Sequence, residues 1–210
     1  MNQRYSIVVF LALTLAGSLT LAQTEGLERI KILTKRAEDT VKKIEDTEKQ
    51  LQGTLNIYNS IVDSTTTDAR KAYRDLVKAV ERCESLVAET GKNSALMEQE
   101  AHNHFAEWTS NLGGISNENL RKRSQDRLNE TRLQYSDILN SGRSARVEFD
   151  TFIDALRDQI VYLGYDLNPT AVASLEKDAF KINEQASVLF KMIDEVVLTS
   201  KEYIQSIQAK

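Results

Sequence analysis

Four long runs in this sequence repeat apolar residues at alternating steps of three and four. The first run extends from Leu27 through Val41 to Val62. This spacing keeps one apolar stripe on one face of a helix for more than four heptads, which is typical of helices that pack side by side. The sequence therefore predicts four helices, over residues 25–63, 68–111, 117–164 and 169–208.

The composition favours the same fold class. Charged residues make up 28% of the chain and apolar residues 41%, with eight glycines and one proline, as in helical bundles rather than sheets. Short turns between the predicted helices place neighbours antiparallel. Helices of this length extend for roughly 60 to 70 Å at 1.5 Å per residue. We expect an all-α protein, an elongated antiparallel four-helix bundle or coiled coil; two hairpins placed end to end also fit, but the matched lengths favour one bundle.

Two stretches are predicted to separate consecutive helices. "NLGGISNEN" contains two glycines that end the second helix. In "LRDQIVYLGYDLNPTAVASL", Asn168 suits a helix N-cap and Pro169 the first helical position, so we interpret this stretch as a joint. Tyr162 and Tyr165 are then expected to close the end of the bundle. Gly91 is interpreted as a weak point inside the second helix, although a break there, giving five helices, remains an alternative.

Gln159 is a lone amide on the apolar stripe of the third predicted helix. Buried polar groups on such stripes can fix helix register at a cost in stability. We therefore predict that Gln159 helps to specify how the third and fourth helices pair, and that Gln159→Leu raises the melting temperature.

The N-terminus is typical of a secretory signal peptide. Arg4 precedes an apolar run of about 15 residues, and Thr20 and Ala22 occupy the positions that a signal peptidase reads. We predict a signal peptide over residues 1–22, a single helical domain over residues 23–210, and export with no transmembrane segment after cleavage. The alternative is an uncleaved anchor, but the run is shorter than the ~20 residues that span a bilayer.

Several function classes are disfavoured. Removal of Arg4 with the leader changes the formal charge from −4 to −5, and an acidic protein is poorly suited to nucleic acid. A single cysteine, Cys83, excludes an internal disulfide framework and is interpreted as a core residue, with an intermolecular disulfide as the lesser alternative. His104 and Glu100 share a helix face but lack the Glu-x-x-His spacing of di-metal bundles. We expect no catalytic residues, no metal and no cofactor.

A basic segment begins the third predicted helix. Between Leu120 and Arg132 five positive charges face two negative ones. Cations in the first turns of a helix oppose its macrodipole, so local stability does not explain them. The favoured interpretation is pairing with acidic faces of the first and fourth helices; the alternative is a site for an anionic envelope component such as a lipid headgroup or a cell-wall polymer. The basic residues of the segment are Arg121, Lys122, Arg123, Arg127 and Arg132.

Three stretches resemble a known family. They are "GLERIKILTKRAEDT" from Gly26, "RSQDRLNETRLQY" from Arg123, and "LRDQIVYLGYDLNPTAVASL" from Leu156. Together the chain resembles the bacterial domain-of-unknown-function family 2959 from about Gly26 to the C-terminus. The resemblance implies a helical envelope protein but supplies no activity and no catalytic residues. Members of the family often carry a lipoprotein cysteine after the leader. In this chain the corresponding residues are Leu21, Ala22 and Gln23, so the resemblance does not imply a lipid anchor.

The expected function is that of a non-enzymatic, exported scaffold or interaction protein of the bacterial cell envelope. Its partner is expected to be another envelope protein, an anionic envelope polymer or a second copy of the chain. The alternative is a lipid- or membrane-surface-binding protein whose bundle opens along its apolar stripe. Melting in the presence and absence of liposomes would separate these two functions. Crosslinking in the periplasm, where an exported envelope protein of this kind is expected, would be the most informative single experiment, because the unknown is a partner.

Overall fold

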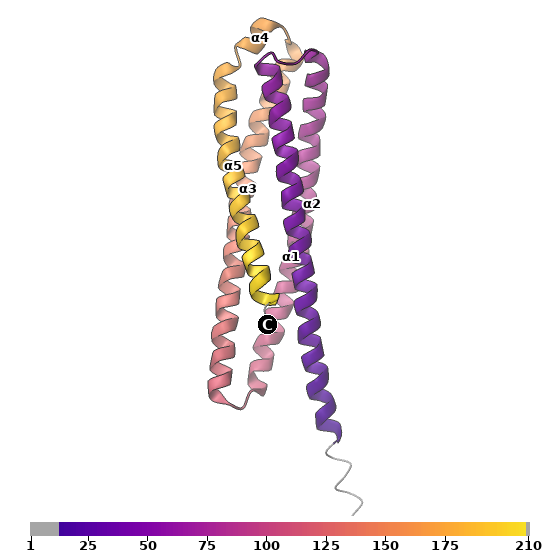
Figure 1. Cartoon of the computed structure of the whole chain (residues 1–210), viewed down its shortest axis with the longest axis vertical. Helices are drawn as coiled ribbons and strands as arrows, with labels where there is room; N and C mark the ends of the chain where they lie inside the picture. Colours follow the sequence, from indigo (N-terminus) through magenta and orange to yellow (C-terminus); the bar gives the residue numbers. More distant parts are fainter. Residues whose placement is uncertain (1–12, 209–210) are drawn as a thin grey trace, which may run out of the picture.

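A computed structural model describes the backbone of residues 13–208 and the side chains of residues 26–208. Four long helices and one short helix account for nearly all of it (Figure 1). A 3-10 turn, η1, follows the second helix. The elements are α1 (Leu13–Val62), α2 (Ala69–Asn111), η1 (Leu112–Gly114), α3 (Glu118–Tyr165), α4 (Pro169–Ala173) and α5 (Glu176–Gln208).

The long helices form one elongated antiparallel bundle. α1 lies against α2 and α5, and α3 lies against the same two helices, so the four make a closed ring (Figure 1). The α1–α2 turn and α4 lie at one end, called the α4 end, and the α2–α3 turn lies at the other, called the η1 end. The all-α prediction is confirmed, and the two pairs of helices lie side by side rather than end to end.

The observed start of the first helix differs from the predicted one. α1 begins at Leu13, not near residue 25, because leucine and alanine, both good helix formers, recur in the stretch before the heptad run and no proline interrupts it. The predicted signal peptide, residues 1–22, lies outside the residues whose side chains are described, so its cleavage stays a prediction. α2 continues through Gly91 without interruption, so the alternative of a break there is wrong.

Among residues 13–208, no helix combines the length and the apolar character that crossing a bilayer requires.

The joint between α3 and α5 has the predicted cap but not the predicted single helix. Asn168 Oδ1 accepts hydrogen bonds from the backbone N–H groups of Thr170 and Ala171, both at 2.9 Å, and Pro169 opens α4. α4 then ends after five residues, so the prediction of one helix over residues 169–208 is wrong. At the break, the Ser174 hydroxyl donates to the carbonyl oxygen of Ala171 at 2.7 Å.

The two tyrosines of the joint behave differently from each other. Tyr162 Oη lies 2.9 Å from Ser174 Oγ, which ties the end of α3 to the break after α4. Tyr165 is 92% exposed, so the expectation that it closes the bundle is wrong. Leu163 is the last buried residue of α3, and Tyr165 lies beyond this core layer.

Removing the cap of α4 is expected to have a measurable cost. Asn168→Ala deletes the acceptor of two backbone N–H groups and should lower the free energy of unfolding by about 1 kcal/mol. Pro169→Ala should cost less, because it mainly increases the freedom of the unfolded chain. Urea denaturation of both variants measures the difference. Equal stabilities of Asn168→Ala and the unmodified protein would contradict the capping role.

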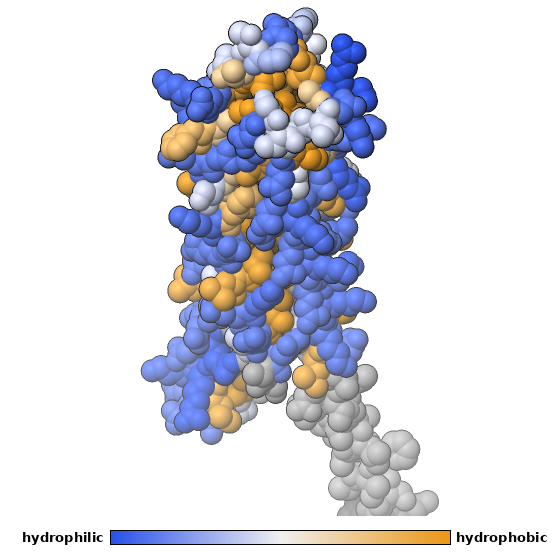
Figure 2. Space-filling model, turned by 45° about the horizontal axis from the view of Figure 1, so that its top comes forward, coloured by the Kyte–Doolittle hydropathy of each residue, from blue (hydrophilic) through white to orange (hydrophobic). Residues whose placement is uncertain are grey.

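The buried core is divided into two clusters along the bundle. The α4-end cluster includes Leu51, Tyr58, Phe152 and Leu189. The η1-end cluster includes, among others, Leu33, Val41, Met97, Phe105, Leu128 and Tyr203. Outside the core the viewed surface is mostly hydrophilic, with a narrow line of hydrophobic residues along the bundle and more of them near α4 (Figure 2).

Gln159 bonds to a different helix from the one predicted. Its Oε1 accepts a hydrogen bond from Tyr58 Oη at 3.2 Å, so it joins α3 to α1 rather than α3 to the C-terminal helix. Tyr58 is fully buried and its ring belongs to the α4-end cluster. The amide therefore satisfies a buried hydroxyl across the diagonal of the bundle.

Candidate functional site

The predicted basic segment lies at the η1 end, in the first turns of α3. All five of its basic residues are exposed. Among the described residues, no carboxylate lies within 4.0 Å of a charged nitrogen of Arg121, Lys122, Arg123 or Arg127. Among the described residues, these four cations therefore form no ion pairs with the acidic faces of the neighbouring helices.

Arg132 has a structural role that separates it from the other four. One of its terminal nitrogens donates to the carbonyl oxygen of Phe105 at 3.2 Å and to Thr109 Oγ1 at 2.7 Å. Its guanidinium also lies 5.7 Å from the centre of the Phe105 ring. Nearby, Trp108 Nε1 donates to Ser124 Oγ at 2.8 Å. These contacts hold the start of α3 against the end of α2 and so present the remaining four cations on a fixed helix.

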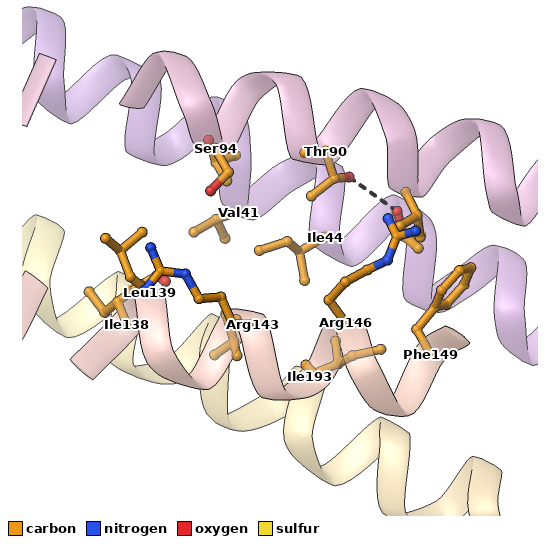
Figure 3. A pocket seen from close by; sticks show the side chains of 18 of the residues that line it. Val41, Ile44, Thr90, Ser94, Ile138, Leu139, Arg143, Arg146, Phe149 and Ile193 are labelled. Carbon is orange, nitrogen blue, oxygen red and sulfur yellow. Dashed lines mark hydrogen bonds between the residues drawn. The ribbon is translucent and has the colours of Figure 1, made fainter. Parts of the chain in front are cut away.

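A second candidate site lies inside the bundle, where the two core clusters meet. A cavity of about 550 Å³ is lined by residues of α1, α2, α3 and α5 (Figure 3). Its lining on α1 extends from Ala37 to Leu51. Fourteen residues of helix correspond to about 21 Å, so the cavity is elongated along the bundle axis.

Sequence reasoning missed this cavity, although the residues that produce it were on the predicted stripes. Thr90 and Ser94 on α2, and Gly142 and Ala145 on α3, occupy consecutive stripe positions and all line the cavity. A Cβ atom added at Gly142 would meet nothing within 4 Å. Small side chains at the same level of two adjacent helices leave space that the aliphatic residues of α1 and α5 do not fill.

The cavity opens between α2 and α3. The lining residues of α1 and α5 are buried, apart from the half-buried Ile44, whereas Gly91 and Glu98 on α2 and Arg143 and Arg146 on α3 are exposed. Figure 3 shows both arginine side chains extending from α3 toward the α2 side. The mouth is thus a polar slot over an apolar interior.

His104 packs against aromatic side chains near the η1 end. His104 is buried, with its ring centre 5.8 Å from that of Phe105 and 5.7 Å from that of Trp108. Burial lowers the pKa of His104, because the charged imidazolium is poorly solvated there. Glu107 forms an ion pair with Arg29 of α1. Across the described part of the chain, no group of three or more His, Cys, Asp or Glu side chains is arranged to hold a metal ion.

Cys83 lies in the α4-end cluster and is fully buried. Its sulfur is 3.3 Å from Thr54 Oγ1, and burial raises the pKa of the thiol. A protonated, inaccessible thiol packs as a small apolar group, as the sequence predicted.

A family model described as "Protein of unknown function (DUF2959)" matches residues 20–207. No curated protein and no solved structure matches the chain. The family match therefore covers α2 to α4 in full, with most of α1 and almost all of α5.

Proposed function

Because this chain belongs to the DUF2959 family of proteins of unknown function, its own surface must indicate its role, and we propose that it is a non-enzymatic interaction protein. In this proposal it is exported to the bacterial periplasm and acts as a rigid helical scaffold in the cell envelope. It binds an anionic surface of another envelope protein or polymer through the start of α3.

One observation carries this proposal. Arg121, Lys122, Arg123 and Arg127 are exposed on a helix that is fixed against α2, and no described carboxylate pairs with them. Arg121 lies at the end of the first turn of α3, where a cation opposes the helix macrodipole and so carries a local cost in stability. A partner with clustered negative charge would offset that cost and gain affinity from the fixed geometry.

The test replaces the four unpaired cations together by glutamine and compares crosslinking in the periplasm. The unmodified protein is expected to crosslink reproducibly to a defined envelope component, identified by mass spectrometry. The variant should lose that product while retaining its melting temperature, since none of the four side chains supports the core. Higher salt should weaken capture of the same component by the purified protein.

The matched control removes four exposed positive charges elsewhere. Replacing Lys35, Lys42 and Lys49 on α1 and Arg74 on α2 by glutamine changes the net charge of the protein by the same amount as the first variant. All four side chains are exposed and lie outside the basic segment. Capture by this control should be unchanged. Equal loss of capture in both variants would show that net charge rather than the start of α3 attracts the partner, and would contradict the proposal.

A second candidate, a protein that opens to lie on a membrane, is favoured by the position of the cavity. The cavity interrupts the core along the α2–α3 seam, where the backbones of the two helices approach each other over the shortest extent of the four neighbouring pairs. The protein should then sediment with vesicles that contain anionic lipid, and these vesicles should abolish its cooperative melting transition. A rigid scaffold should retain that transition when vesicles are present.

A further inference from the structure

The mid-bundle cavity has the size and shape of a ligand site rather than of a packing defect. Its volume of about 550 Å³ lies within the range of roughly 300 to 1,000 Å³ that is usual for small-molecule pockets. Its lining residues on α1 span about 21 Å of helix, which exceeds the ~15 Å that one leaflet contributes to the hydrocarbon thickness of a bilayer. A long, narrow apolar space of this kind fits an extended acyl chain better than a compact ligand.

The cavity wall offers water few partners. The hydroxyls of Thr40, Thr47 and Thr90 donate to the carbonyl oxygens four residues earlier in their own helices, at 2.8, 2.8 and 2.9 Å. Among the described residues, none of the buried side-chain polar atoms without a partner belongs to a lining residue. A buried water needs two to four polar partners, so apolar atoms are the better filling for this space.

The mouth supplies a place for an anionic group. Arg143 lines the cavity, and its contact with Glu98 across the slot is long, at 3.7 Å. Arg146 also lines the cavity and contacts Asp150 through Nε and one terminal nitrogen, both at 3.0 Å. A guanidinium has five N–H donors, so each arginine keeps donors for a further carboxylate.

We propose that the mid-bundle cavity binds one long-chain fatty acid, with its acyl chain along the bundle axis and its carboxylate between Arg143 and Arg146. The ligand enters through the slot between α2 and α3, and the bundle stays closed around it. Glu98 competes for Arg143 and so limits the affinity. This site is separate from the proposed partner contact at the start of α3, so an experiment that contradicts one proposal leaves the other standing.

The first test measures binding to the purified, delipidated full chain by isothermal titration calorimetry below the micelle concentration. Hexadecanoate is expected to bind at one site per chain. Hexadecanol should bind more weakly, because it fills the cavity without pairing with the arginines. Hexadecylammonium should be the weakest of the three. No saturable binding of hexadecanoate, or tighter binding of hexadecylammonium, would overturn the proposal.

Variants of the cavity wall separate occupation of the cavity from surface adsorption. Gly142→Leu places a side chain where a Cβ meets nothing within 4 Å, so it should abolish binding of both the acid and the alcohol. Gly53→Leu is the matched control, since Gly53 is an exposed helical glycine outside the cavity that also has open space around it. Gly142→Ala, a smaller change, should weaken binding if Gly142→Leu does not fold. Unchanged binding in a folded Gly142 variant would contradict the assignment.

Variants of the mouth test the position of the carboxylate. Replacing Arg143 and Arg146 by glutamine should lower the affinity for hexadecanoate about tenfold and leave that for hexadecanol unchanged. Glu98→Gln should raise the affinity for hexadecanoate alone. Glutamine at Arg74 and Arg82, which are exposed on α2 outside the cavity, is the control. Equal effects on the acid and the alcohol would show that the arginines do not hold the carboxylate.

Discussion

Phe152→Ala is expected to lower the free energy of unfolding by about 3 to 5 kcal/mol, the usual cost of deleting a buried aromatic ring. Phe152 is fully buried in the α4-end cluster, to which all four long helices contribute residues. Deleting the ring removes its buried apolar surface and leaves a cavity in this cluster. Urea denaturation monitored by circular dichroism gives the change.

Phe180→Ala is the matched control for this experiment. Phe180 is on α5 and is 65% exposed, so the same substitution there should change the stability by no more than about 0.5 kcal/mol. A cost below about 1 kcal/mol for Phe152→Ala would mean that the α4-end cluster does not hold the bundle together.

Gln159→Leu is expected to lower the stability by about 1 to 3 kcal/mol, the penalty for a buried polar group that loses its partner. The sequence alone predicted the opposite sign, because a lone amide on an apolar stripe looks replaceable. The structure changes the expectation, since Gln159 Oε1 accepts the hydrogen bond of the fully buried Tyr58 hydroxyl. Leucine would leave that hydroxyl in the core without its acceptor.

A double-mutant cycle isolates this interaction. Tyr58→Phe removes the hydroxyl, so adding it to Gln159→Leu should recover part of the lost stability. Gln134→Leu, at an exposed position of α3, is the control and should have little effect. Additive costs for Tyr58→Phe and Gln159→Leu would show that the hydrogen bond contributes nothing.

The helices were predictable because their signal is repeated many times. Each stripe contains about ten apolar positions, and glycine, asparagine and proline mark the turns, so single exceptions do not alter the pattern. The break after α4 carries no such marker. Ser174 ends the helix through its own hydroxyl and a bond to Ala171, and this competition between side chain and backbone depends on local geometry.

The contacts between helices were less predictable than the helices. A stripe shows which face of a helix is buried but not which helix it faces, so the partner of Gln159 was assigned wrongly. The cavity was missed for a related reason. The stripe pattern records the position of a residue but not the volume of its side chain. The cavity forms because small residues of α2 and α3 lie at the same height along the bundle, namely Thr90, Ser94, Gly142 and Ala145. The basic segment was predicted because a cluster of charges within one helix can be recognised without knowing which helices pack against it.

The division of the core into two clusters has a consequence for how the molecule comes apart. The α4-end cluster is closed by two chain reversals, whereas the last described residues of α5 pack in the η1-end cluster. Helices fray from free ends, and cooperative units of a fold open at different free energies. The η1 half should therefore exchange its amide hydrogens first, while the α4 half remains folded. Such an opening would transiently release the start of α3 from its contacts with α2, while the α4-end cluster keeps the four long helices together.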